Sequence, residues 1–251
     1  MSELEVKKDN LPAELKEWGD GPNVTAQDLV LPKLLPLQYM SEKVKNKQGE
    51  YGEFRDTVAN ELFGSLEKPF EVIPFFMQKK WVEFDMIPQR GGGYDREFKQ
   101  IVLIQDNPTR EGFNDDLPLV DEAAKVERDR VMDFFCLIPE QIKEGNDFPY
   151  VLSFQRTSLK AGKKLGTQMY VRNKMAGLNP AATAIEVSGQ DVQNDKGSYV
   201  VQDIRPSRAA LKEEQMAALK WLKIVNTSKV KVDDSEYSES DDLEVEDIKD
   251  F

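Results

Sequence analysis

Hydrophobic and polar positions along the middle of the chain follow the pattern of β-strands. Five runs are rich in aromatic and β-branched residues and are separated by turn-forming or charged segments. They cover residues 71–77, 81–84, 98–104, 131–138 and 150–155. Pro74 lies inside the first run, and because proline cannot donate a ladder hydrogen bond, it predicts an edge position or a bulge there. The chain is therefore expected to be rich in β-structure.

The segment 157–174 has a helical period instead. Ala161, Leu165 and Met169 recur every four residues and predict one buried, apolar face. Two glycines within the segment each weaken a helix by about 1 kcal/mol. The pattern still favours a helix that lies against the sheet.

A hairpin and a second helix are expected near the end of the chain. Residues 184–189 and 197–205 alternate around the turn sequence Asn-Asp-Lys-Gly, which is typical of a β-hairpin. Residues 207–225 then carry paired apolar positions on one face, the pattern of an amphipathic helix.

The distribution of proline, glycine and charge divides the chain into three parts. Residues 1–27 are polar and predict a flexible N-terminal arm, residues 28–226 the core, and residues 227–251 a disordered acidic tail. The apolar run 28–40 contains prolines that forbid a long helix and is expected to lie extended along the core surface. Residues 105–128 are acidic and turn-rich and predict an insertion loop or flap.

This element order predicts an α+β fold that is mostly β. Several strands, a helix between strands, a closing hairpin and a C-terminal helix form the order of an OB-fold with insertions. The OB-fold is a five-stranded, partly open barrel that binds oligonucleotides. A generic α+β arrangement with the same order is the alternative.

Composition excludes several kinds of site. The chain of 251 residues has no histidine and one cysteine, which excludes disulfide frameworks, common zinc sites and catalytic groups that need histidine. No phosphate-binding glycine loop is present. No apolar run approaches the ~20 residues of a membrane helix, and the N-terminus carries no apolar signal core. We expect a cytoplasmic protein that needs no metal or cofactor and is not an enzyme.

Acidity is concentrated at the C-terminus. Residues 233–251 hold ten acidic residues and one lysine, which accounts for −9 of the net charge of −12. Such a segment repels itself and stays disordered. It ends on Phe251, and a terminal ring among carboxylates is suited to dock into an apolar pocket with a basic rim. A tail that serves only solubility is the simpler alternative.

The segment 154–174 reverses this charge, with six basic residues and no acidic one. Aromatic side chains and cations together suit single-stranded nucleic acid, because cations replace counterions along phosphates while rings accept stacked bases. A second cluster surrounds Lys79, Lys80 and Trp81, and a further basic loop holds Lys43, Lys45 and Lys47. The alternative is that these lysines form a solvated face and the aromatic residues belong to the core.

The acidic spacer with its terminal Phe251, behind an aromatic and basic β-rich body, resembles the single-stranded DNA-binding proteins of bacteria and tailed phages. The stretch VLSFQRTSLKAGKKLGTQM also resembles a phage replication-associated binding-protein family. The resemblance implies an OB-fold core, binding of single strands without sequence specificity, and a tail that contacts replication and recombination enzymes. The length of the body and the loop at 105–128 depart from the bacterial pattern.

The predicted function is therefore a phage-type single-stranded DNA-binding protein acting in the host cytoplasm. The residues expected to contact DNA are basic or aromatic: Lys79, Lys80, Trp81, Phe76, Tyr94, Arg156, Lys160, Lys163, Lys164, Tyr170, Arg172 and Lys174. The tail residues expected to contact a polymerase, helicase or nuclease are Asp247, Ile248, Asp250 and Phe251. The oligomeric state is left open, with a homodimer as one option.

Two rival functions remain open at this point. Asp85, Glu97 and Lys99 have the spacing in which two carboxylates hold Mg²⁺ and a lysine helps to activate water, as in a nuclease. Alternatively, the acidic surface is itself the working part of a DNA mimic or interaction protein, and the body does not bind DNA.

Overall fold

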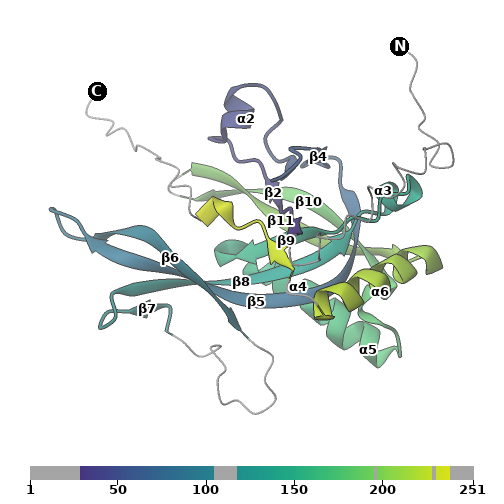
Figure 1. Ribbon diagram of the computed structural model, residues 1–251. Helices are drawn as coiled ribbons and strands as arrows, with labels where there is room; N and C mark the ends of the chain where they lie inside the picture. The colour runs from purple at the N-terminus through teal and green to yellow at the C-terminus, as the bar shows by residue number, and fades with distance from the viewer. Residues whose placement is uncertain (1–28, 105–117, 195–196, 228–229, 238–251) are drawn as a thin grey trace, which may run out of the picture.

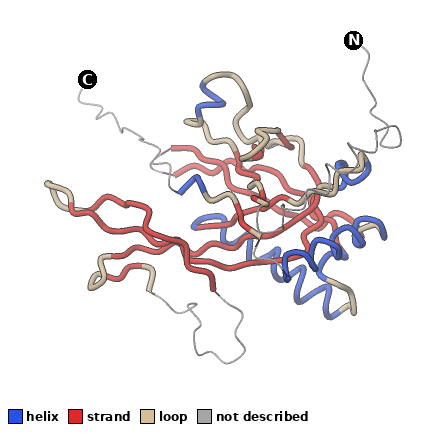
Figure 2. Tube along the Cα trace, viewed as in Figure 1, coloured by secondary structure: helices blue, strands red, loops and turns tan. Residues whose placement is uncertain are grey.

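The computed structural model describes residues 29–104, 118–194, 197–227 and 230–237. The fold is mostly β, with a curled half-barrel sheet and most of its helices at one end (Figure 1, Figure 2). The sheet has seven strands: β5 Phe70–Pro88, β6 Tyr94–Ile104, β7 Val120–Asp121, β8 Val126–Leu137, β9 Tyr150–Gln155, β10 Thr183–Asn194 and β11 Gly197–Ala209. It therefore differs from the expected five-stranded barrel in the number of its strands.

Strand β5 organises the sheet because it pairs along its whole length with two sets of neighbours. It is antiparallel to β8 from Ile73 to Asp85, while its other edge pairs with β10 at the start and with β6 from Lys79 to Pro88. The register shifts between Pro74 and Phe76, which confirms the bulge predicted from the proline. The two short strands predicted at 71–77 and 81–84 are one strand.

The far halves of β5 and β8, together with β6 and β7, project from the body as an arm (Figure 1). Residues 105–117 of the predicted flap lie outside the described residues. Residues 120–128 form a short hairpin, because β7 pairs with β8 through Val120 and Glu127 around a turn at 122–125. The prediction of a flap is therefore wrong for that part of the range.

The predicted helix between strands follows β9. It consists of a 3₁₀ turn Arg156–Ser158, helix α4 Leu159–Gly166, a π-helical segment Thr167–Arg172 and helix α5 Asn173–Met175. The predicted apolar stripe is confirmed, since Ala161, Leu165 and Met169 are buried. They join one hydrophobic core, which includes Phe134, Leu152 and Phe154.

The hairpin β10–β11 is confirmed, and helix α6 Lys212–Thr227 follows it. The helix begins five residues later than predicted because residues 207–209 still belong to β11. Ala218 and Trp221 of α6 pack with Phe75 and Phe135 in a second hydrophobic core. The helical segments α4 and α6 thus contribute to two separate cores of one sheet.

The N-terminal part of the core forms small elements. They are β1 Val30–Leu31, β2 Leu34–Pro36, helix α2 Glu42–Lys45, β3 Phe54–Asp56 and β4 Leu62–Phe63. The described part of the run 28–40 contains the extended strands β1 and β2, in line with the prediction of an extended segment. It is not confined to the surface, since Leu31, Leu34 and Leu37 are buried. The short helix α3 Pro139–Lys143 and a 3₁₀ turn Pro180–Ala182 complete the body.

The chain returns to the N-terminal segment after α6. Strand β12 Lys231–Val232 pairs in parallel with β1, and a 3₁₀ turn Ser235–Tyr237 follows. Residues 230–237, expected to belong to a disordered tail, are thus part of the folded body. The expected arm 1–27 and residues 238–251 lie outside the described residues. Within the described ranges, no helix has the length and apolar character needed to cross a membrane.

Candidate nucleic-acid interface

Helix α4 and the π-helical segment present a row of basic side chains because their opposite face is anchored in the core. Leu165 and Met169 are almost completely buried against the sheet, so Lys160, Lys163 and Lys164 project outward and are exposed. None of these three lysines forms an ion pair with another residue in the described part of the chain. The row is therefore available to an external anion.

A basic groove runs between this helical segment and the β10–β11 hairpin. It has a volume of about 530 Å³, and its apolar lining residues are Ile185, Ile204 and Pro206. Its basic lining residues are Lys160, Lys163, Lys164, Arg172 and Arg205. Four of these five were predicted. Arg205 was missed, although the predicted hairpin ended on it, because nothing in the local pattern places that strand end beside the helix.

An aromatic groove of about 690 Å³ lies along another part of the same helical segment. Phe76, Tyr170 and Val171 contribute to its lining, and Lys163 lines both grooves. The structure thus brings together two of the four predicted stacking residues, next to the predicted lysines. The π-helical geometry of Thr167–Arg172 shapes this region, and π-helical insertions are frequent at functional sites.

Other predicted residues lie elsewhere. Lys80 and Trp81 are only 1% and 2% exposed, so neither reaches the surface. Lys79 is half-buried on β5, and Lys174 is exposed on α5 without lining either groove. Placing Lys80 and Trp81 at an exposed DNA surface is therefore wrong for this structure, because Asp234 of the C-terminal segment pairs with Lys80 and the Trp81 side chain is buried.

Tyr94 and Arg156 are accessible but engaged. The Tyr94 hydroxyl donates to Glu127 on the arm at 2.8 Å, and this hydrogen bond raises its pKa. Arg156 has a φ of 48° and donates from Nε to Asp129 Oδ2 at 2.9 Å. The tail residues Asp247, Ile248, Asp250 and Phe251 lie outside the described residues.

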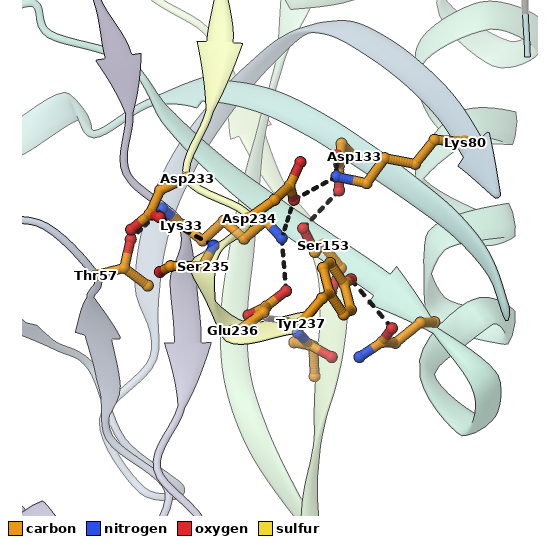
Figure 3. A network of polar contacts seen from close by, with 12 residues as sticks. Lys33, Thr57, Lys80, Asp133, Ser153, Asp233, Asp234, Ser235, Glu236 and Tyr237 are labelled. Carbon is orange, nitrogen blue, oxygen red and sulfur yellow. Dashed lines mark hydrogen bonds and ion pairs between the residues drawn. The ribbon is translucent and has the colours of Figure 1, made fainter. Parts of the chain in front are cut away.

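A buried ionic network lies under the C-terminal segment, where it was not predicted (Figure 3). Lys33 is 0% exposed, and its Nζ lies 2.5 Å from both Asp234 Oδ1 and Glu236 Oε1. Lys80 Nζ lies 2.7 Å from Asp133 Oδ2 and 2.6 Å from Asp234 Oδ1. Two lysines from distant parts of the chain therefore share one carboxylate.

Electrostatics in this network favour the charged form of Lys33. Burial alone would lower the pKa of Lys33, but the carboxylates of Glu236, Asp133 and Asp234 outweigh it and hold the pKa above its ordinary value of 10.5. The Tyr237 ring lies near both ammonium groups, with its centroid 4.6 Å from Lys33 Nζ. Burial and the neighbouring carboxylates raise the pKa of Tyr237, so its hydroxyl stays neutral. In the sequence, the sign of this network was the charged Lys33 inside the apolar run 28–40.

The residues of the rival nuclease pattern come together on the arm. Asp85 lies opposite Glu97 in the β5–β6 ladder, and Lys99 Nζ forms an ion pair with Asp85 Oδ1 at 2.8 Å. Among the described residues, no group of three or more potential ligands is positioned to hold a metal ion.

Comparison with known proteins gives one finding. The model of a family described as Pam3 phage gp34-like protein matches residues 6–231. No curated protein and no solved structure matches the chain.

Proposed function

The chain belongs to the Pam3 phage gp34-like protein family, and from this premise and the basic groove we propose that it binds single-stranded DNA without sequence specificity during phage replication or recombination. The observation that carries the proposal is the convergence of five cationic side chains in one groove beside an aromatic groove. The protein acts without a cofactor, as a binding protein in the host cytoplasm.

The groove supplies the two interactions that a single strand needs. Lysine and arginine side chains along α4 and β11 neutralise successive phosphates and release counterions. Tyr170 and Phe76 lie on the neighbouring aromatic groove, where base stacking contributes about 1–3 kcal/mol per base. Lys163 lines both grooves and joins the phosphate path to the stacking surface. Neither interaction depends on base identity.

The acidic C-terminal segment has a separate role in this proposal. It competes with DNA for the basic groove, and once displaced it offers Phe251 and the neighbouring Asp250, Ile248 and Asp247 to a polymerase, helicase or nuclease. Deletion of Phe251 should spare DNA binding and abolish binding of that partner. Loss of both activities would exclude a docking role for the terminal ring.

The test is the salt dependence of oligo-dT binding, followed by fluorescence anisotropy of a labelled strand. Changing Lys160, Lys163 and Lys164 together to Ala should reduce the slope of log K against log salt by about 2, since each single-strand phosphate contact contributes about 0.7. The matched control replaces Lys125, Lys143 and Lys212, which are also exposed but line neither groove. Equal slopes for both triple variants would show that the groove lysines do not contact DNA. If the wild-type protein binds no DNA, the result favours the alternative of an acidic interaction protein.

The cross-strand placement of Asp85 and Glu97, with Lys99 beside them, favours one second candidate, a Mg²⁺-dependent nuclease. This function requires cleavage of single-stranded DNA that appears with Mg²⁺ and disappears in Asp85→Ala and Glu97→Ala. Stable oligonucleotides in the presence of Mg²⁺ would exclude it.

A further inference from the structure

The C-terminal strap, residues 230–237, covers the lysine network. Its backbone is attached by the two-residue pairing of β12 with β1 and by the hydrogen bond from Asp233 N–H to the Leu31 carbonyl at 2.9 Å. Most of its other interactions are made by side chains that point into the body (Figure 3). The strap is therefore held mainly by what its side chains bind.

Its two central carboxylates occupy a cationic site. Asp234 bridges Lys33 and Lys80, and Glu236 binds Lys33. If the whole strap leaves, Asp133 is the one carboxylate of these ion pairs that remains beside the two ammonium groups. A buried site with excess positive charge is costly until an anion enters. The site therefore requires an anion, and in this structure the strap supplies it.

The strap also supplies a flat ring beside these anions. Tyr237 stacks on Phe98 of the arm, with ring centroids 6.4 Å apart and planes inclined by 18°. The Tyr237 hydroxyl donates to Gln155 Oε1 at 3.2 Å. The two carboxylates that bind lysines resemble phosphates, and the ring that stacks on Phe98 resembles a base. A short stretch of single-stranded DNA carries the same groups.

We propose that Lys33, Lys80 and Phe98 form a second binding site for single-stranded DNA, which Asp234, Glu236 and Tyr237 occupy in its absence. The proposal rests on the proposed function, because it takes the same class of ligand. It adds a site built from β5, β6 and the N-terminal segment, away from the groove beside α4. Phosphates replace the two carboxylates, and a base replaces the Tyr237 ring on Phe98.

A path leads to this site from the surface. A groove of about 480 Å³ borders the strap at Ser235 and Glu236 and is also lined by Lys43 and Arg55. Among the described residues, the Nε of Arg55 is buried without a hydrogen-bond partner. Lys43 belongs to the basic loop that the groove beside α4 does not use. A strand leaving the Lys33–Lys80 site would therefore meet further cations.

Exchange of the strap for DNA is electrostatically balanced. Removing one partner from a buried ion pair is strongly destabilising, but a phosphate that enters as a carboxylate leaves keeps both lysines paired. The exchange must also break the backbone hydrogen bonds of β12 and release Val230 and Val232 from the second hydrophobic core. The strap thus keeps the site intact until a polyanion takes its place.

The direct test is hydrogen exchange of the full-length protein with and without saturating oligo-dT. The amides of residues 231–237 should exchange faster with DNA bound, approaching the rate of unprotected amides. The triple α4 variant, saturated at a higher DNA concentration, should show the same acceleration, because the second site does not use the groove. Unchanged or slower exchange of this segment in the DNA complex would overturn the proposal.

A variant pair tests the same site by affinity. Asp234→Asn together with Glu236→Gln should weaken the strap, increase oligo-dT affinity and steepen the salt slope by about 1.4, the value for two more phosphate contacts. Glu140→Gln together with Glu144→Gln makes the same change of charge at two exposed positions, one in α3 and one at its C-cap, and should leave the slope unchanged. Equal slopes in the two double variants would count against the site, and if the strap variant fails to fold, hydrogen exchange of the wild type decides.

These outcomes separate the two proposals. Absence of oligo-dT binding by the wild-type protein contradicts the proposed function itself. Binding that depends on the α4 lysines but leaves the strap protected supports the groove and overturns only the second site.

Discussion

The lysines of α4 and the lysines under the C-terminal strap differ in exposure and in their ion partners. Lys160, Lys163 and Lys164 are exposed and form no ion pair with another described residue. Lys33 and Lys80 are buried, and three carboxylates surround them. The comparison shows that the charge of a lysine does not determine its role; the nearest carboxylates do.

The difference has an energetic basis. An exposed lysine keeps its hydration, so replacing it changes stability little but removes a counterion-release contact with DNA. A buried lysine has lost its hydration and depends on its partners, so removing a partner leaves an uncompensated charge. Loss of an ion partner of the buried lysines should therefore lower the unfolding free energy much more than replacement of the exposed lysines. Replacement of the exposed lysines should have the larger effect on the salt dependence of DNA binding.

The largest effect is expected from shortening the chain. A protein that ends at Val232 lacks Asp234, Glu236 and Tyr237, so Lys33 and Lys80 keep only Asp133 between them. We expect it to lose about 3–5 kcal/mol of unfolding free energy in urea denaturation, the usual cost of breaking a buried ion pair. A protein that ends at Tyr237 is the control and should match the full chain. Equal stability of both would show that the strap is not part of the fold.

Asp133→Ala should have the next largest effect. Asp133 is 0% exposed, binds Lys80 and accepts a hydrogen bond from Ser153 Oγ at 2.5 Å. Because Asp234 still pairs with Lys80, we expect a loss of about 3 kcal/mol, at the lower end for a buried ion pair. Urea denaturation measures it, and a loss below that of an exposed lysine variant would contradict the role of this network.

Substitution of the two glycines in the helix that carries the exposed lysines should affect stability differently. A Cβ at Gly162 would lie 2.8 Å from Phe154 Cβ, whereas at Gly166 the nearest atom, Met77 Sδ, would be 3.6 Å away. Gly162→Ala should therefore destabilise the protein by about 1–3 kcal/mol through overpacking. Gly166→Ala should be neutral or stabilise it by up to about 1 kcal/mol, through helix propensity. Thermal unfolding of both variants would show whether Gly162 is required for close contact with β9.

Alkaline pH should reduce the contribution of the buried Lys33 to stability. The carboxylates around Lys33 overcome the effect of burial and raise its pKa above 10.5, so its contribution to stability is present below pH 10.5 and is lost as pH rises further. The difference in unfolding free energy between the wild type and Lys33→Met should therefore be constant from pH 7 to 9 and shrink above pH 10.5. A difference that stays constant across this window would mean that the pKa of Lys33 is the same in the folded and the unfolded protein, and would contradict the effect of the surrounding carboxylates.

The smallest change in stability is expected from Lys164→Ala. This exposed side chain lines the basic groove, and its loss should change the unfolding free energy by less than about 0.5 kcal/mol. The salt slope of oligo-dT binding should nevertheless fall by about 0.7. A stability loss comparable to that of Asp133→Ala would place Lys164 in the fold instead of the interface.

Local patterns alone determined much of this molecule. The strand at 150–155 was predicted with its observed bounds, and the stripe of Ala161, Leu165 and Met169 was predicted with the correct face buried. Those predictions succeed because side-chain direction repeats with a fixed period within one element. The groove lysines follow from the same stripe, since fixing its apolar face also fixes the opposite one.

Tertiary structure alone decided what lies between elements. Lys80 and Asp234 are 154 residues apart in the chain, and Lys33 and Glu236 are 203 apart, so no local period reports their pairing. The same holds for Arg205, which reaches the groove only because the hairpin packs beside α4. Charge and periodicity are properties of the sequence, whereas burial and the choice of ion partner depend on which distant segments meet in the fold.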